Sequence, residues 1–192
     1  MMKTVNILIC GVGGQGVLLA GDIIAETAIA SGFDAKKSEV HGMAQRGGSV
    51  VSHVRFGQKV NSPLIREGEA DVILSFEEME TARYLQFLKT EGCLIINQQQ
   101  IIPMSVATGQ AEYPIDIVEK IKQQVKNVVL CPGMELAEKA GSAKAVNTVL
   151  LGALAKKLEL APDKWHEVIS RRVPAKTVEL NKKAFELGYS QQ

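Results

Sequence analysis

Residues 4–16 read TVNILICGVGGQG, a run of apolar and β-branched residues that stops at a cluster of glycines. Such a run is typical of a strand that is buried on both faces of a parallel sheet. The next segment, residues 17–32, places apolar side chains on one helical face and Asp22 and Glu26 on the other, and it stops at Gly32. The order of strand, glycine turn and helix predicts the opening of a βαβ unit.

The alternation of strands and helices continues along the chain. Further strands are expected at residues 35–40, 71–76, 93–97 and 127–132, and helices at residues 77–89, 114–125 and 143–158. Residues 162–172 and 175–188 each begin near a proline and predict a pair of surface helices. We therefore expect one domain over residues 1–192, with a Rossmann-like, three-layer α/β/α fold, a mostly parallel sheet and a helical C-terminal part.

Residues 49–57, SVVSHVRFG, differ from the other strands because their apolar and polar side chains alternate. This alternation is typical of an antiparallel or edge strand, so we expect an antiparallel hairpin at the edge of the sheet. Gly57 and Gln58 are expected to turn the chain into a short return strand before Pro63.

The composition excludes several classes of protein. Of the 192 residues, 46% are hydrophobic and 22% are charged, as in ordinary globular domains. A net charge of +1 and an aromatic content of 5% do not favour nucleic-acid binding, which needs a basic surface or stacking platforms. The apolar run at residues 5–9 is too short to span a membrane. Because no Arg-rich or cleavable leader is evident, we expect the protein in the cytoplasm.

The cysteines do not predict a metal centre. They are Cys10, Cys93 and Cys131. An iron–sulfur cluster or a structural zinc needs closely spaced thiolates with further ligands, and the three histidines of the chain supply no such pairing. Each cysteine borders an apolar run, so each is expected to be a small buried hydrophobic residue.

The glycine turn is the first candidate site. Gly11, Gly13, Gly14, Gln15 and Gly16 satisfy the GxGxxG pattern between a strand and a helix. Glycines let backbone N–H groups at a helix N-terminus approach an anion, which the helix dipole also favours. The Gln15 amide could bind a ligand or could tie the turn to itself. In a dinucleotide-binding domain Glu39 would be the residue that binds the ribose.

A second polar loop follows the strand at residues 35–40 and lies where open α/β sheets bind their ligands. Its candidate binding residues are Gln45, Arg46, Gly47, Gly48 and Ser49. The Arg46 guanidinium beside free N–H groups suits a carboxylate or a phosphate, although a salt bridge to Glu39 is the alternative. His41 could be a general base, but no partner for it is evident in the sequence.

GVGGQG followed by SEVHGMAQRGGSVVSHVRFG closely resembles the gamma-type subunit of 2-oxoacid:ferredoxin oxidoreductases, and the HGMAQRGG form is most similar to the small, beta subunit of the indolepyruvate-specific members. The resemblance extends through DVILSFEEMETARYL, CLIIN and AVNTVLLGALAKKL. It implies an enzyme complex that oxidatively decarboxylates an aryl 2-oxoacid, reduces ferredoxin and forms an acyl-coenzyme A. In that family thiamine diphosphate and the 4Fe–4S clusters are held by a large alpha subunit.

The resemblance therefore implies a chain that carries no tightly bound cofactor and is inactive alone. Coenzyme A is expected as a co-substrate, and the two glycine loops would form a rim around the site of the partner subunit. Two alternatives remain open at this point. One is an independent NAD(P)- or flavin-nucleotide-binding domain, and the other is an interaction module whose loops only dock a partner.

Overall fold

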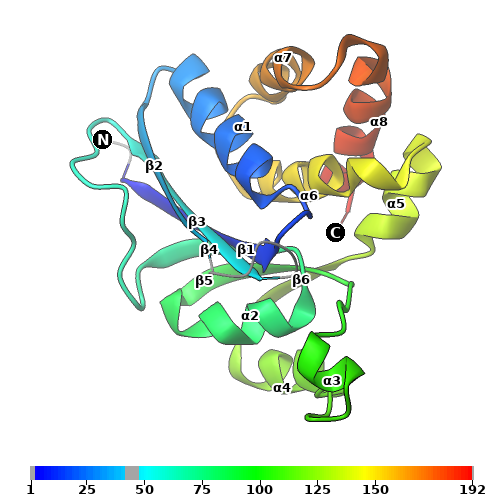
Figure 1. The fold of residues 1–192 in the computed structure, drawn as a ribbon. Helices are drawn as coiled ribbons and strands as arrows, with labels where there is room; N and C mark the ends of the chain where they lie inside the picture. The colour runs from blue at the N-terminus through cyan, green and yellow to red at the C-terminus, as the bar shows by residue number, and fades with distance from the viewer. Residues whose placement is uncertain (1–2, 42–47, 192) are drawn as a thin grey trace.

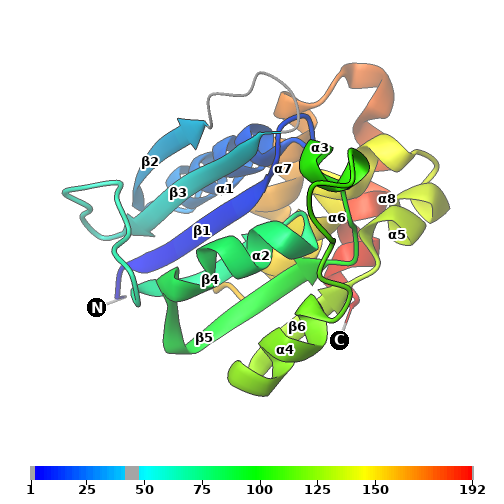
Figure 2. The ribbon, with the colours of Figure 1, turned by 60° about the horizontal axis from the view of Figure 1, so that its bottom comes forward.

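The computed structural model describes residues 3–41 and 48–191, and these form a single twisted sheet covered by helices on both faces (Figure 1). The strands are β1 (Val5–Val12), β2 (Asp34–His41), β3 (Ser49–Gly57), β4 (Ala70–Ser75), β5 (Leu88–Asn97) and β6 (Asn127–Cys131). Their order in the sheet is β2-β3-β1-β4-β5-β6, as Figure 2 shows. Strand β3 runs antiparallel to both of its neighbours, β2 and β1, and the pairs β1–β4, β4–β5 and β5–β6 are parallel.

The helices make up the two outer layers. They are α1 (Val17–Ala30), α2 (Glu78–Tyr84), α3 (Met104–Ala107), α4 (Ile117–Gln124), α5 (Gly133–Ala140), α6 (Val146–Ala155), α7 (Pro162–Arg172) and α8 (Val178–Tyr189). Short 3-10 turns lie at Leu85–Phe87, Ala143–Ala145 and Ala175–Thr177. In Figure 1, α1 and α5 to α8 lie above the sheet, and α2, α3 and α4 lie below it. Among the described residues no helix has the length and apolar character needed to cross a membrane.

Strand β1 shows why both faces of the sheet must be covered. Ile7 and Ile9 belong to the core on the α1 and α6 side, whereas Leu8 and Cys10 belong to the core on the α2 and α4 side. All four side chains are fully buried. A strand without a polar face is stable only between two layers, which confirms the three-layer α/β/α prediction.

An antiparallel hairpin at the edge of the sheet is confirmed, but β2 rather than β3 is its edge strand. β2 and β3 pair as an antiparallel hairpin and β2 forms the edge, while β3 lies inside the sheet between β2 and β1. The return strand expected after Gly57 is absent from the described residues. The Val60 N–H donates to the Asp34 carboxylate, and the Arg55 guanidinium donates to the carbonyl of Leu64. Side chains thus satisfy backbone groups that a strand partner would otherwise satisfy.

The helix expected at residues 77–89 is shorter than predicted. α2 ends at Tyr84, and Leu88 already pairs with Ala70 as the first residue of β5. A long-range strand pairing therefore overrides the local helical pattern in this segment.

The expected pair of C-terminal surface helices is present, and α7 and α8 each bury an aromatic residue on their inner face. Trp165 on α7 and Phe185 on α8 are fully buried. Helix α8 packs directly on α6, where a Cβ at Gly188 would lie 1.9 Å from the Val149 carbonyl oxygen. Such a close approach requires glycine. Helix α6, buried along its whole length, is thus enclosed between α8 and the sheet, as its apolar sequence predicts.

Candidate functional site

The two glycine loops meet at the edge of the sheet where the parallel strands end. The Gly13 N–H donates a hydrogen bond of 2.9 Å to the Gly48 carbonyl oxygen. Ser49, the first residue of β3, lies opposite Val12, the last residue of β1. The antiparallel direction of β3 therefore brings the start of this strand to the glycine turn after β1.

The structure places most of the predicted site residues at this one edge. Gly11 to Gly16, Gly48 and Ser49 lie together there. Gln45, Arg46 and Gly47 lie outside the described residues. His41 is the last residue of β2 and pairs with Val50 through the backbone. The described residues therefore bring together the first loop and the end of the second.

Gln15 ties the turn to itself and to two neighbouring loops. Its Oε1 accepts a hydrogen bond of 2.7 Å from the Val12 N–H. Its Nε2 donates to the Phe76 carbonyl oxygen at 2.9 Å and to Gln99 Oε1 at 3.0 Å. Both amide hydrogens and the amide oxygen are thus engaged within the protein. Of the two interpretations that the sequence allowed, the structure favours the structural one for this side chain.

The backbone of the same turn is open. Gly13 and Gly14 are exposed, and a Cβ at Gly14 would meet no atom within 4 Å. Gly14 and Gly16 adopt φ angles of +99° and +87°, which glycine tolerates best. Gly16 is the N-cap of α1, and no described side chain caps this helix. The N–H groups of its first turn are therefore suited to an anion, with the helix dipole adding to the attraction.

The loops after β4 and β5 complete this edge of the sheet, and sequence analysis missed most of their contribution. Asn97 Nδ2 donates to the Phe76 carbonyl oxygen at 3.0 Å, and Asn97 Oδ1 accepts from the Gly133 N–H at 3.2 Å. Asn97 thereby joins the ends of three parallel strands. A polar residue at the end of the apolar run 93–97 is the only sequence signal for this role.

Glu77 caps α2, as its place at the start of this helix predicts. Its side chain is 1% exposed and accepts a hydrogen bond of 2.9 Å from the Glu80 N–H. The other carboxylate oxygen accepts from the Tyr113 hydroxyl at 2.8 Å and from the Ile101 N–H at 3.2 Å. Burial, and then this hydrogen bond, raise the pKa of Tyr113. The Glu77 carboxylate thus fastens the loop after β5 to α2.

A hollow of about 270 Å³ opens beside the turn, on the α2 side of the sheet. Its polar wall contains Ser49, Glu80 and Arg83, and residues 101–104 form an apolar wall. The Ser49 hydroxyl donates to the Glu80 carboxylate and lies 3.1 Å from the Tyr84 hydroxyl. Arg83 Nε donates to Glu80 at 3.1 Å. Ser49 and Arg83 therefore supply hydrogen bonds to the carboxylate of the buried Glu80 side chain.

Strand order argues against a dinucleotide site that uses Glu39. Glu39 lies opposite Ser52 on β3, and Ser52 lies opposite Ile9 on β1. Two strand spacings, roughly 10 Å, therefore separate Glu39 from β1. The Glu39 carboxylate is also paired with Lys37. The ribose-binding residue expected beside the glycine turn is thus displaced by the intervening β3.

The cysteines occupy buried positions on three different strands, as expected. Cys10 and Cys131 are fully buried and Cys93 is half-buried, and none is in a disulfide. Burial raises the pKa of the Cys10 and Cys131 thiols to about 12. Cys10 donates to the Ser75 hydroxyl at 3.3 Å. No group of metal-ligating side chains occurs among the described residues, so these thiols do not fit an iron–sulfur cluster.

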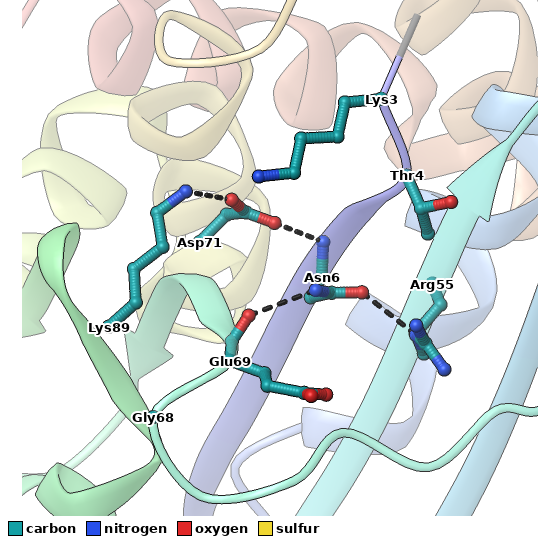
Figure 3. A pocket seen from close by; sticks show the side chains of 8 residues that line it. All are labelled: Lys3, Thr4, Asn6, Arg55, Gly68, Glu69, Asp71 and Lys89. Atoms are coloured by element: carbon teal, nitrogen blue, oxygen red, sulfur yellow. Dashed lines mark hydrogen bonds and ion pairs between the residues drawn. The ribbon is translucent and has the colours of Figure 1, made fainter.

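A hollow of about 410 Å³ at the opposite edge of the sheet contains mainly structural contacts (Figure 3). The Asn6 N–H donates to Asp71 at 2.7 Å, and Arg55 donates to the Asn6 side chain at 2.8 Å. Lys89 pairs with Asp71. These contacts join the starts of β1, β4 and β5 to the end of β3. The charged side chains of Asp71, Lys89 and Arg55 thus all have partners within the protein.

Comparisons with known proteins agree with the geometry. The model of the pyruvate ferredoxin/flavodoxin oxidoreductase family matches residues 6–191. "Indolepyruvate oxidoreductase subunit IorB" of Thermococcus kodakarensis is 42% identical over 192 residues, covering 97% of this chain and 95% of the relative. The protein of the same name from Archaeoglobus fulgidus is 42% identical over 190 residues, covering 97% of this chain and 94% of the relative.

Solved structures show the same fold. The gamma subunit of a keto/oxoacid ferredoxin oxidoreductase from Geobacter sulfurreducens matches with a TM-score of 0.72 and 26% identity, over 96% of each chain. The 2-oxoglutarate:ferredoxin oxidoreductase from Magnetococcus marinus matches with a TM-score of 0.76 and 20% identity, over 99% of this chain and 31% of that chain. The chain therefore belongs to the pyruvate ferredoxin/flavodoxin oxidoreductase family and is similar, along nearly its whole length, to the gamma-type subunits of that family.

Proposed function

We propose that this chain is one subunit of a cytoplasmic, ferredoxin-dependent 2-oxoacid oxidoreductase that acts on indolepyruvate. The observation that carries the proposal is the 42% identity to indolepyruvate oxidoreductase subunits over 97% of the chain. The hydrogen bond between Gly13 and Gly48 also supports it, because it brings the two glycine loops together at the edge of the sheet where a binding site was expected. The complex would convert the 2-oxoacid and coenzyme A to carbon dioxide and an acyl-coenzyme A, and would pass two electrons to ferredoxin.

The redox cofactors would lie in a large partner subunit. Thiamine diphosphate supplies the carbanion chemistry of 2-oxoacid decarboxylation, and iron–sulfur clusters carry the electrons. The separate, mostly buried thiols of Cys10, Cys93 and Cys131 do not fit a cluster, so this chain would hold none. The partner subunit and ferredoxin are therefore required for turnover.

The role of this chain is to bind and to position. The open N–H groups at Gly14 and at the start of α1 suit the phosphate or carboxylate oxygens of a ligand such as coenzyme A. Gln15 and Asn97 hold the turn and the neighbouring loops in place. A rigid rim of this kind orients a co-substrate and keeps water out, which accelerates a reaction without any proton transfer by the rim itself.

We assign no proton transfer to His53 or to His166. His53 is buried, its Nδ1 accepts a hydrogen bond of 3.2 Å from the Ile65 N–H, and burial lowers its pKa. His166 contacts Glu186 in the helical layer. His41, at the end of β2, remains the candidate base within this proposal. The expected result is that the isolated chain does not consume a 2-oxoacid.

Reconstitution tests the proposal. The purified chain is mixed with the thiamine-bearing subunit of the same organism, and reduction of ferredoxin is followed with indolepyruvate and coenzyme A. Pyruvate and 2-oxoglutarate serve as comparison substrates. We expect reduction only when both subunits are present, with indolepyruvate the preferred substrate. Equal rates with and without this chain would refute the proposed function.

A variant in the second loop tests whether this loop binds a co-substrate or only docks the partner subunit. If the loop only docks the partner, Arg46→Ala weakens assembly and leaves the turnover of assembled complexes intact. If the loop binds a co-substrate, the same variant raises the KM for coenzyme A while the complex still assembles. Size-exclusion chromatography of the mixture, combined with the ferredoxin assay, distinguishes the two results.

A further inference from the structure

The segment that joins β5 to α4, residues 98–116, is long and none of its residues is buried. It belongs to neither of the two core clusters. Its one helix, α3, lies at the periphery of the molecule, away from the sheet (Figure 1). Connections in compact domains usually have about 4–6 residues, and much longer ones are typically functional. The segment therefore does not stabilise the core, and we expect it to serve another purpose.

The composition of this segment is that of an interface. Residues 98–115, QQQIIPMSVATGQAEYPI, contain a single charged residue, Glu112, although 22% of the whole chain is charged. The side chains of Ile102, Met104 and Ile115 are 53%, 78% and 89% exposed. Protein interfaces are depleted in charged residues at their centre and enriched in methionine, and an apolar patch that water would otherwise cover marks such an interface. Another protein surface is therefore expected to cover these side chains.

Hydrogen bonds fix both ends of the segment beside the candidate site. Gln99 Oε1 accepts from Gln15 Nε2 at 3.0 Å, which joins the start of the segment to the glycine turn. The buried Glu77 carboxylate accepts from the Ile101 N–H and from the Tyr113 hydroxyl, one near each end of the segment. A surface that is held in place before its partner arrives loses less entropy on binding.

A hollow of about 270 Å³ separates this segment from α2. Residues 101–104 form its apolar wall, and Arg83 lies on the opposite wall. The half-exposed Arg83 side chain uses Nε to bind Glu80, and no described residue binds its two terminal nitrogens. The hollow can therefore receive an apolar side chain of another protein, with a carboxylate beside it on Arg83.

We propose that residues 98–115 and Arg83 form the docking surface for the large, thiamine-bearing subunit. The choice of this partner rests on the proposed function, in which the thiamine of the partner must reach the edge where the glycine loops meet. Gln99 joins the segment to that edge. A domain of this fold makes up 31% of the Magnetococcus marinus chain, where the rest of that chain is permanently attached to it. The partner would insert an apolar side chain beside Met104 and place an acidic side chain on Arg83.

Isothermal titration calorimetry of the full chain with the thiamine-bearing subunit of the same organism tests the surface. The double variant Met104→Ser, Ile115→Ser changes two exposed positions, so it should fold normally, and its Kd should be at least about tenfold higher. Arg83→Gln should raise the Kd about threefold. Ile29→Ser is the matched control, because Ile29 is 57% exposed but lies on α1, and it should change the Kd less than about twofold. Equal midpoints of urea unfolding confirm that the compared chains are folded.

Two further measurements separate docking from other roles of the segment. At saturating concentrations of the partner, the double variant should reduce ferredoxin with the wild-type kcat, because these side chains dock and do not react. In hydrogen-exchange experiments, the backbone amides of residues 103–111 should exchange more slowly in the complex than in the free chain, and those of residues 26–32 should not change.

The docking surface is wrong if the folded double variant binds the partner as tightly as the wild type, or if residues 103–111 exchange equally fast in the complex and in the free chain. It is also wrong if the segment pairs with a second copy of this chain. In that case the isolated wild type would dimerise in sedimentation experiments, the double variant would stay monomeric, and the Kd for the partner would not depend on the substitutions.

The two proposals can fail separately. If the complex oxidises indolepyruvate and the double variant binds the partner normally, the proposed function stands and the docking surface is wrong. If the double variant weakens the complex but no mixture oxidises indolepyruvate, the docking surface stands and the proposed function is wrong. If the wild-type chain does not bind the thiamine-bearing subunit at all, both are wrong.

Discussion

The N–H of Gly13 donates a hydrogen bond of 2.9 Å to the carbonyl oxygen of Gly48 and so ties the turn after β1 to the start of β3. The Gln15 side chain fastens the same turn to the loops after β4 and β5. The candidate site at this edge is thus made of backbone that amide side chains hold in place.

Replacing Gln15 with leucine should destabilise the fold. Gln15→Leu leaves the Val12 N–H without its side-chain acceptor, whereas the Phe76 carbonyl keeps its hydrogen bond from Asn97 Nδ2. An unpaired buried polar group costs about 1–3 kcal/mol. We expect a lower midpoint of urea unfolding with an unchanged m-value. Gln98→Leu, at an exposed position, is the matched control and should stay within about 0.5 kcal/mol of the wild type. Equal midpoints for Gln15→Leu and the control would contradict the structural role of Gln15.

Two glycine variants should separate backbone strain from a steric clash. Gly14→Ala places a side chain at a φ of +99° with open space around it, so only the left-handed backbone cost of about 1–2 kcal/mol is expected. Gly16→Ala has a similar φ, +87°, but its Cβ would lie 2.9 Å from Asn147 Nδ2. Chemical denaturation should therefore show a larger loss for Gly16→Ala. Identical losses would show that Asn147 does not lie against Gly16.

Stability should fall at alkaline pH partly because of Tyr113. Burial, and then the hydrogen bond to Glu77, raise the pKa of this phenol in the folded state. The folded chain therefore keeps the proton to a higher pH than the unfolded chain, whose tyrosines ionise near pH ~10. This contribution to stability is complete below about pH 10 and is lost as the pH rises further.

Tyr113→Phe tests this titration. Urea unfolding of the wild type and the variant is compared between neutral and alkaline pH. The variant should be less stable at neutral pH, because the hydrogen bond is lost, and the difference should shrink as the pH rises. The thiols titrate in both proteins, so they cancel in the comparison. A difference that is constant with pH would exclude the raised pKa.

The thiols should differ in reactivity. Cys10 and Cys131 are fully buried, so in the folded chain a thiol reagent such as dithiobis-nitrobenzoate should modify only the half-buried Cys93, and slowly. All three thiols should react in denaturant. Cys93→Ser should abolish the reaction of the folded chain. Rapid modification of three thiols under native conditions would show that the buried positions of Cys10 and Cys131 are wrong.

Local pattern was enough to predict the core of the fold. The β-branched run that stops at Gly11 predicts a buried strand, and the apolar spacing up to Gly32 predicts a helix, because both depend on side chains close in the sequence. The alternation in residues 49–57 likewise predicts an antiparallel strand. The position of the candidate edge follows, since parallel strands end on one side.

Strand order and long-range contacts depended on the tertiary structure. No local signal places β3 between β2 and β1, yet that insertion joins Gly13 to Gly48 and separates Glu39 from the turn. Asn147 reaches Gly16 only because α6 packs between α8 and the sheet, where Gly188 allows close contact. Pairing and packing of this kind are set by burial over the whole chain, so residues distant in sequence meet at positions that periodicity cannot reveal.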